Sequence, residues 1–171
     1  MRFVSSSLTL ILVATTALSS QESADSVHRF ETYAVSDTFR GKPVPVDLTS
    51  APHARRFATV LRQGAASGPN FGGHFTIVTW GCGTSCEQLA IVDAASGRVW
   101  FYNRTLEVGA QFCLGSALLV DGPPEDWYSA WESVRLPNRA YTFYYRWTGH
   151  RFELIDSVRV PPKRRSCLTC A

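Results

Sequence analysis

The sequence predicts an α+β fold, a mostly antiparallel β-sheet with one N-terminal helix packed on it. Three observations predict this fold. Only residues 52–63 place apolar side chains at helical spacing. Five or six short apolar runs follow, most of them ending at Gly, Pro, Asn or Asp. Two pairs of these runs are joined by short turns, as in β-hairpins. A chain of 171 residues is expected to form one domain.

The first twenty residues are predicted to be a signal peptide, not part of the fold. Arg2 supplies a positive charge, residues 8–18 carry no charge and are mainly apolar, and small residues follow at positions 17, 19 and 20. The apolar run is shorter than the roughly 20 residues of a membrane span. We therefore expect a secreted or periplasmic protein that is soluble after signal cleavage.

Residues 21–50 are predicted to form an extended lead-in to a single α+β domain at residues 51–160. Pro43 and Pro45 favour extended backbone there, because proline fixes its own φ and restricts the residue before it. Residues 161–171 form a basic, Cys-containing tail.

The helix is predicted from Pro52 to Gln63. Thr49 or Ser50 is expected to cap its start and Gly64 to end it. Its apolar stripe consists of Ala54, Phe57, Ala58, Val60 and Leu61.

The first strand should be central, because it is apolar on both faces. Turns at 94–97 and 148–150 predict two hairpins. Trp127 and Trp131, four residues apart, suit one helical turn or a covering loop. The strands are expected at residues 75–80, 88–93, 98–102, 117–120, 141–147 and 152–158.

The composition is that of a globular protein, with 45% apolar and 18% charged residues. A net charge of +3 is too small to indicate nucleic-acid binding. We expect no nucleic-acid partner, no cofactor and no bound metal. Nothing in the sequence requires a second subunit, so a monomer is expected.

If the protein is exported, its five cysteines are expected to form disulfides, because thiols pair in oxidising compartments. Local pairing predicts Cys82–Cys86 and Cys167–Cys170 disulfides, with Cys113 left free. A cross-link from Cys113 to the tail is the alternative. The connectivity stays open at the level of sequence.

The segment 70–86 is the candidate site, because it gathers glycines, a histidine and two cysteines around a predicted strand. Loops at strand ends often carry function. Alternation places His74 on the same face as Thr76, Val78 and Trp80. The candidate binding residues are Asn70, His74 and Trp80.

This stretch resembles a group of small exported bacterial proteins of uncharacterised function. They carry an N-F-x-G-H strand, then W-G-C-G-T-x-C, then a D-x-x-x-G-x-V hairpin. The resemblance covers about residues 69–102 and implies a shared fold and a bacterial envelope or secreted setting, but no activity. The matching positions are Asn70, Gly73, His74, residues 80–84, Cys86, Asp93 and Gly97.

Two non-catalytic hypotheses are favoured. In the first, residues 70–86 are structural, with a stapled loop and a hydrogen-bonded His74. In the second, the domain binds a protein or glycan partner through rigid loops and aromatic side chains. Exposure of Trp100, Tyr102, Trp127 and Trp131 would support the second.

Two chemical alternatives use the same segment. A hydrolase would take Cys82 or Cys86 as nucleophile and His74 as base, with Asp93 or Glu87 orienting the histidine. A zinc site would combine Cys82, Cys86, Cys167 and Cys170, with or without His74. Export opposes both, because each needs reduced thiols.

Overall fold

The computed structural model describes residues 28–132 and 135–161. The predicted signal peptide and all of the predicted tail after residue 161 lie outside this range. The fold is α+β, as predicted, with two antiparallel sheets in place of one. The elements in chain order are η2 (Phe30–Tyr33), η3 (Ala54–Phe57), α1 (Ala58–Ala65), β1 (Phe75–Gly83), β2 (Cys86–Asp93), β3 (Val99–Phe101), β4 (Ala110–Gln111), β5 (Leu118–Asp121), α2 (Pro124–Ala130), β6 (Tyr141–Trp147) and β7 (Phe152–Arg159).

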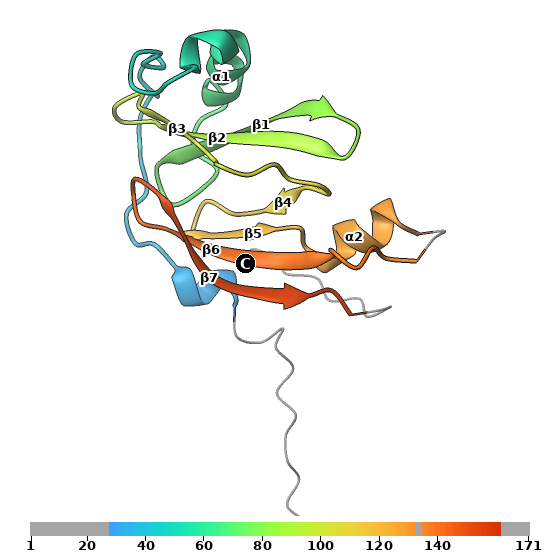
Figure 1. Ribbon diagram of the computed structural model, residues 1–171. Helices are drawn as coiled ribbons and strands as arrows, with labels where there is room; N and C mark the ends of the chain where they lie inside the picture. The colour runs from blue at the N-terminus through green and yellow to red at the C-terminus, as the bar shows by residue number, and fades with distance from the viewer. Residues whose placement is uncertain (1–27, 133–134, 162–171) are drawn as a thin grey trace, which may run out of the picture.

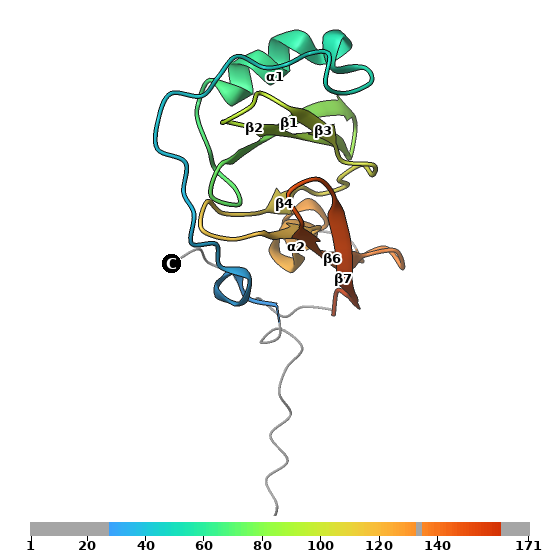
Figure 2. The ribbon, with the colours of Figure 1, turned by 90° about the vertical axis from the view of Figure 1, so that its left-hand side faces the viewer.

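The two sheets form the middle layers of the molecule (Figure 1). The first has the strand order β1-β2-β3 and the second the order β4-β5-β6-β7. Turned by 90°, the molecule shows α1 above the first sheet and η2 beneath the second (Figure 2). The two predicted hairpins are present as β2–β3 and β6–β7. In the described part of the chain, no helix combines the length and apolarity needed to span a bilayer.

The main core lies between the sheets. Ile77 and Ile91 of the first sheet belong to the same buried cluster as Leu119 and Trp147 of the second. Apolar burial of this kind is the dominant stabilising term in folding. The members of this cluster are Phe71, Phe75, Ile77, Leu89, Ile91, Tyr102, Leu106, Leu119, Tyr145 and Trp147.

The helix differs from its prediction in three ways. It lies mid-chain, it is split into η3 and α1, and it continues past Gly64 to Ala65. A Cβ on Gly64 would lie 2.6 Å from both methyl carbons of Val78, so the glycine allows α1 to approach β1 closely. Thr49 and Ser50 do not cap it. The Ser50 hydroxyl instead accepts a hydrogen bond from the Val99 N–H at 2.9 Å.

Strand β1 is an edge strand, not the central strand that the sequence predicted. Its first four residues are buried on both faces, because α1 packs on one face and the second sheet on the other. Two-sided burial therefore reports the layers above and below a strand and does not fix its position within the sheet.

Residues 35–47 form an extended segment, here called the strap, that runs up one side of the molecule from η2 towards α1 (Figure 2). Val35 N–H donates to the Gly115 carbonyl at 2.9 Å, beside the second sheet. Phe39 N–H donates to Gly73 at 2.9 Å and Asp47 N–H to Gly97 at 2.8 Å, beside the first. The strap therefore connects the two sheets along their sides.

Candidate functional site

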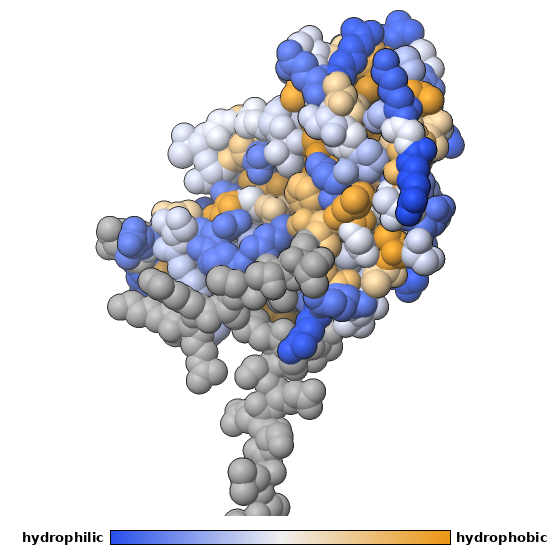
Figure 3. Space-filling model, turned by 180° about the vertical axis from the view of Figure 1, so that it is seen from behind, coloured by the Kyte–Doolittle hydropathy of each residue, from blue (hydrophilic) through white to orange (hydrophobic). Residues whose placement is uncertain are grey.

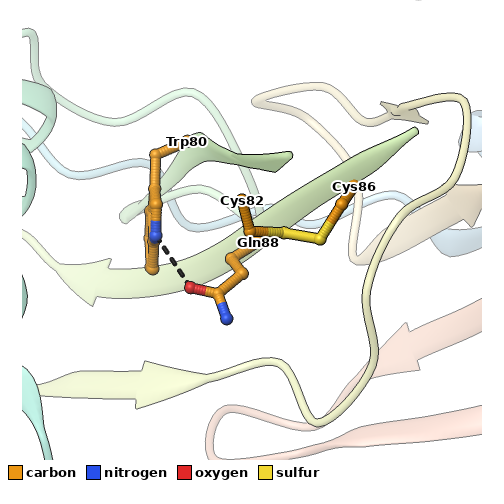
Figure 4. Close-up of a disulfide and its surroundings, with 4 residues drawn as sticks. All are labelled: Trp80, Cys82, Cys86 and Gln88. Carbon is orange, nitrogen blue, oxygen red and sulfur yellow. Dashed lines mark hydrogen bonds between the residues drawn. A yellow bond between two sulfur atoms is a disulfide. The ribbon is translucent and has the colours of Figure 1, made fainter. Parts of the chain in front are cut away.

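The hairpin of β1 and β2 ends in the predicted Cys82–Cys86 disulfide (Figure 4). The two Cα atoms are 5.1 Å apart, and the bridge joins the end of one strand to the start of the next. Trp80 lies beside it and donates its indole N–H to Gln88 Oε1 at 2.8 Å. The Trp80 ring packs 4.8 Å from the Phe57 ring. Trp80 therefore holds the hairpin against the helical layer.

Cys113 is also disulfide-bonded, so it is not the free thiol that local pairing left over. Cys167 and Cys170, with their predicted disulfide, lie outside the described residues. Because Cys82 and Cys86 are bonded to each other, neither offers a thiolate for nucleophilic attack or zinc binding in this state.

His74 lies at the start of β1, with its side chain 35% exposed, and bonds to Asp93. The distance from Nδ1 to Asp93 Oδ1 is 3.0 Å. Asp93 also accepts the Ala95 N–H and the Ser96 hydroxyl. Burial raises the pKa of Asp93, but the bonds from Ser96, His74 and Ala95 outweigh it and hold the pKa below its usual value. His74 thus helps to fix the turn between β2 and β3.

Asn70 completes the free edge of β1. Its Oδ1 accepts the Ile77 N–H at 2.7 Å and its Nδ2 donates to the Ile77 carbonyl at 3.1 Å. The amide therefore makes the two hydrogen bonds that a neighbouring strand would otherwise make.

The three predicted binding residues do not converge. Asn70 bonds to Ile77, His74 to Asp93 and Trp80 to Gln88. Strand geometry alone separates His74 from Trp80 by roughly 20 Å, at about 3.3 Å per residue, and from Cys82 by more. Of the catalytic groups considered from sequence, the structure brings His74 only to Asp93.

A different part of the molecule is hollowed. Two adjoining depressions, each with a volume of about 710 Å³, share Gln88, Tyr102, Asn103 and Arg104 among their lining residues. We name the first the Asp121 pocket and the second the β3 groove. Their volumes fall within the roughly 300–1,000 Å³ of ligand sites.

The Asp121 pocket lies where β5 ends. Asp121 is 5% exposed, and its Oδ2 accepts the Tyr102 hydroxyl at 2.8 Å. Arg104 Nε lies 3.7 Å from the same oxygen. Burial raises the pKa of Asp121, against the opposing effects of Tyr102 and Arg104. Burial, followed by the charge of Asp121, also raises the pKa of Tyr102, so its hydroxyl remains a donor.

The rim of the Asp121 pocket is also paired within the protein. Arg139 Nε lies 3.0 and 3.1 Å from the two carboxylate oxygens of Glu107. The Arg104 guanidinium stacks 4.2 Å from the Phe143 ring centroid. These groups satisfy one another, which leaves this pocket little polar capacity for a ligand.

The β3 groove has a different character. Three arginines and two histidines line it beside aromatic rings, and the described residues of its lining include no carboxylate. Trp147 is 5% exposed, and its indole N–H finds no acceptor in the described part of the chain. Its basic lining residues are His53, Arg56, Arg104, His150 and Arg151, and its aromatic ones are Phe57, Trp100, Phe101, Tyr102, Trp147 and Phe152.

The aromatic exposure anticipated from sequence is only partly present. Trp100 and Trp131 are half-buried, whereas Tyr102 and Trp127 are buried. Of these four, Trp100 and Tyr102 line the β3 groove. Arg56, Arg104 and Trp147 were not predicted as site residues, because they come from distant segments without a shared motif.

Apolar surface also occurs away from the groove. Seen from behind, it occupies the middle of the molecule with hydrophilic surface around it (Figure 3). The large apolar side chains that are exposed among the described residues are Val44, Leu114, Leu154 and Ile155. Scattered exposure of this kind is normal for soluble domains.

No protein-family model matches the chain, and no significant match was found among curated proteins or solved structures. The geometry of the β3 groove therefore carries the functional argument.

Proposed function

We propose that the protein is an exported, non-catalytic binding domain that holds its partner in the β3 groove. Export is supported by the sequence of the first twenty residues and by a Cys82–Cys86 disulfide, which is consistent with an oxidising compartment. A secreted or periplasmic location follows from the same proposal.

The composition of the β3 groove is the observation that carries this proposal. Binding sites combine apolar walls with a few polar groups that fix the ligand. Here, aromatic rings supply the walls, and Arg56 supplies a charge without an ion-pair partner among the described residues. Arginine and aromatic side chains are also the residues enriched at binding hot spots.

A non-catalytic role is supported because the groups that a hydrolase or a zinc site would require are already engaged within the fold. The hydrolase needs a cysteine thiolate near His74, and the zinc site needs several thiolates. Cys82 and Cys86 are in a disulfide, and His74 is engaged with Asp93. The proposal therefore assigns residues 70–86 a supporting role in the fold.

The thiol state is tested by intact mass and alkylation of the exported native protein, together with zinc analysis. We expect no alkylation at Cys82 or Cys86 and no zinc. Alkylation of either cysteine, or one zinc per chain, would restore the hydrolase or metal hypothesis.

The location of binding is tested with two defined panels, a peptide library and a set of neutral and acidic oligosaccharides. Arg56→Glu should weaken any groove ligand at least about tenfold, a change of roughly 1.4 kcal/mol. Arg55→Glu is the matched control, since Arg55 is its exposed neighbour but does not line the groove. Equal binding by both variants, or no ligand in either panel, would contradict the proposal.

A further inference from the structure

The outer edge of β3 is open along the β3 groove. Among the strands that the structure describes, β3 pairs with β2 alone. Asp93 N–H donates to the Arg98 carbonyl and Tyr102 N–H to the Leu89 carbonyl, so Arg98 and Tyr102 direct backbone groups towards β2. Since strand residues alternate, Val99 and Phe101 direct theirs outward.

One of these outward groups is already satisfied within the protein. The Val99 N–H donates to Ser50 Oγ at 2.9 Å, and this hydroxyl in turn donates to the Asp47 carbonyl at 2.6 Å. Val99 itself is only 1% exposed, so in the described part of the chain the open edge consists of the N–H and the carbonyl of the half-buried Phe101. Val99 and Phe101 both line the groove. An open strand edge is a template for another extended chain.

The walls of the groove suit the side chains of such a chain. Phe57 and Phe101 pack together on the helical side of the first sheet, with ring centroids 5.8 Å apart. Trp100 and Trp147 pack on the side that faces the second sheet, 5.5 Å apart. A strand added to β3 would direct alternate side chains to these two sides.

The charged residues of the groove determine which sign of charge a ligand should carry. The Arg56 guanidinium lies 5.7 Å from the centroid of the Phe57 ring and has no ion-pair partner among the described residues. Arg151 is paired with Glu153, and Arg104 lies near Asp121. Because no described residue places a carboxylate opposite Arg56 and His53 in the groove, a negatively charged ligand is complementary there.

The indole N–H of Trp147 is an independent sign of an absent acceptor. It is buried and has no acceptor among residues 28–132 and 135–161, although Trp147 lines the groove. Leaving a buried donor without an acceptor is destabilising. A carbonyl or carboxylate oxygen brought by a ligand would remove this cost if the ring turned slightly towards the groove.

We infer that the β3 groove binds an extended, acidic peptide segment, which pairs with the outer edge of β3 and places its carboxylates near Arg56. This inference rests on the proposed binding function and names its ligand class. Backbone groups spaced as in a strand favour a peptide over a glycan, since only a peptide offers matching donors and acceptors.

The test uses an acetylated and amidated octapeptide of alternating Glu and Val as the probe. Binding to the full exported protein is followed by calorimetry up to about 1 mM peptide. Two further peptides carry backbone N-methyl groups at odd or at even positions. N-methylation in the register that faces β3 should weaken binding at least about tenfold, and methylation in the other should change it less than about twofold.

Charge and site are tested in the same experiment. Arg56→Ala should weaken the acidic peptide, Arg55→Ala should not, and the Lys–Val counterpart should not bind. Equal effects of both N-methyl registers, or no binding of the acidic peptide, would overturn the inference. If an acidic oligosaccharide binds in an Arg56-dependent way and the peptide does not, the peptide inference fails and the binding function stands. If neither binds, both fail.

Discussion

The Asp121 carboxylate depends on Tyr102, since both side chains are buried and the hydroxyl donates to Oδ2. Removing the donor leaves a buried charge with fewer partners. Replacing the Asp121 carboxylate with a neutral acceptor should cost much less stability. Substitutions that remove the Tyr102 donor and those that remove the Asp121 charge are therefore expected to change stability differently.

We predict that Tyr102→Phe lowers the free energy of unfolding by roughly 1–3 kcal/mol at neutral pH. Asp121→Asn keeps an oxygen for the Tyr102 hydroxyl and should leave stability unchanged or raise it. Urea unfolding measures both. A larger loss in Asp121→Asn than in Tyr102→Phe would contradict this account.

The raised pKa of Asp121 gives this comparison a pH dependence. The folded state binds the proton more tightly than the unfolded state, so ionisation of Asp121 is destabilising. The penalty is fully present above the folded-state pKa and disappears below the unfolded value of about 3.9. The stability difference between the parent and Asp121→Asn should therefore shrink as the pH falls through this window.

Asp93 has the opposite dependence, because its pKa is lowered in the folded protein. Its contribution is present above the unfolded value of about 3.9 and is lost as the pH falls through the folded-state pKa. We predict that Asp93→Asn removes part of the acid-induced loss of stability below about pH 4. Parallel pH–stability curves for parent and variant, from thermal unfolding, would count against this role.

Among the connecting elements, the strap passes very close to two glycines beside the first sheet. A Cβ on Gly73 would lie 1.9 Å from the Asp37 carbonyl oxygen, and one on Gly97 would lie 2.2 Å from that of Pro45. Both glycines also have positive φ, at 82° and 74°. Gly73 and Gly97 are two of the positions that carry the resemblance described above, and strap packing accounts for a glycine at these two positions.

We predict that Gly73→Ala and Gly97→Ala each destabilise the protein by more than the roughly 1–2 kcal/mol of a strained left-handed residue. Gly68→Ala is the matched control, since Gly68 has φ of 85° but no atom within 4 Å of an added Cβ. Chemical denaturation of the three variants separates the steric term from backbone strain. Equal losses of stability in all three variants would show that the strap moves away from an added Cβ without an energetic penalty.

The disulfide acts on one hairpin and encloses a short loop. Loop-closure entropy for about five residues gives roughly 2 kcal/mol at most. We predict that the Cys82→Ser/Cys86→Ser double variant loses up to this amount and is still exported. Unfolding midpoints and the amount of exported protein measure the two effects. Failure of export, or unchanged stability, would contradict a local staple.

The elements show where sequence patterns are informative. The hairpins were predictable, because turn residues and alternating apolar runs are local. Strand β4 was not, since two residues, Ala110 and Gln111, form no pattern. Gly64 resembled a helix end, but its small size serves contact with Val78. Asn70 hydrogen-bonds the backbone of Ile77 at the free edge of β1, and this role becomes evident only once the fold places the two residues side by side.

Across the whole molecule, one core joins the two sheets, so they should unfold together. Leu119 of the second sheet is fully buried in the same cluster as Ile91 of the first. We predict that Leu119→Ala costs about 2–5 kcal/mol. Native-state hydrogen exchange should show the same loss of protection in β2 as in β6. A loss confined to β5 and its neighbours would indicate two independent units.

The same scale explains why the sequence did not point to the β3 groove. The β3 groove combines residues near positions 53, 100 and 150, which the fold brings together. No spacing rule connects them. The predicted residues Asn70, His74 and Trp80 stood out because they cluster in sequence, and each has a partner within the fold.

The strap also constrains the order in which parts of the fold can form. Its neighbour Phe30 receives a hydrogen bond from Ser116, which is 86 residues further along the chain. Its own partners, Gly73, Gly97 and Gly115, all come later in the sequence. The N-terminal part of the chain emerges first during synthesis, yet the strap can settle only after the residues that bind it exist. Completion of this fold must therefore wait until most of the chain has been synthesised.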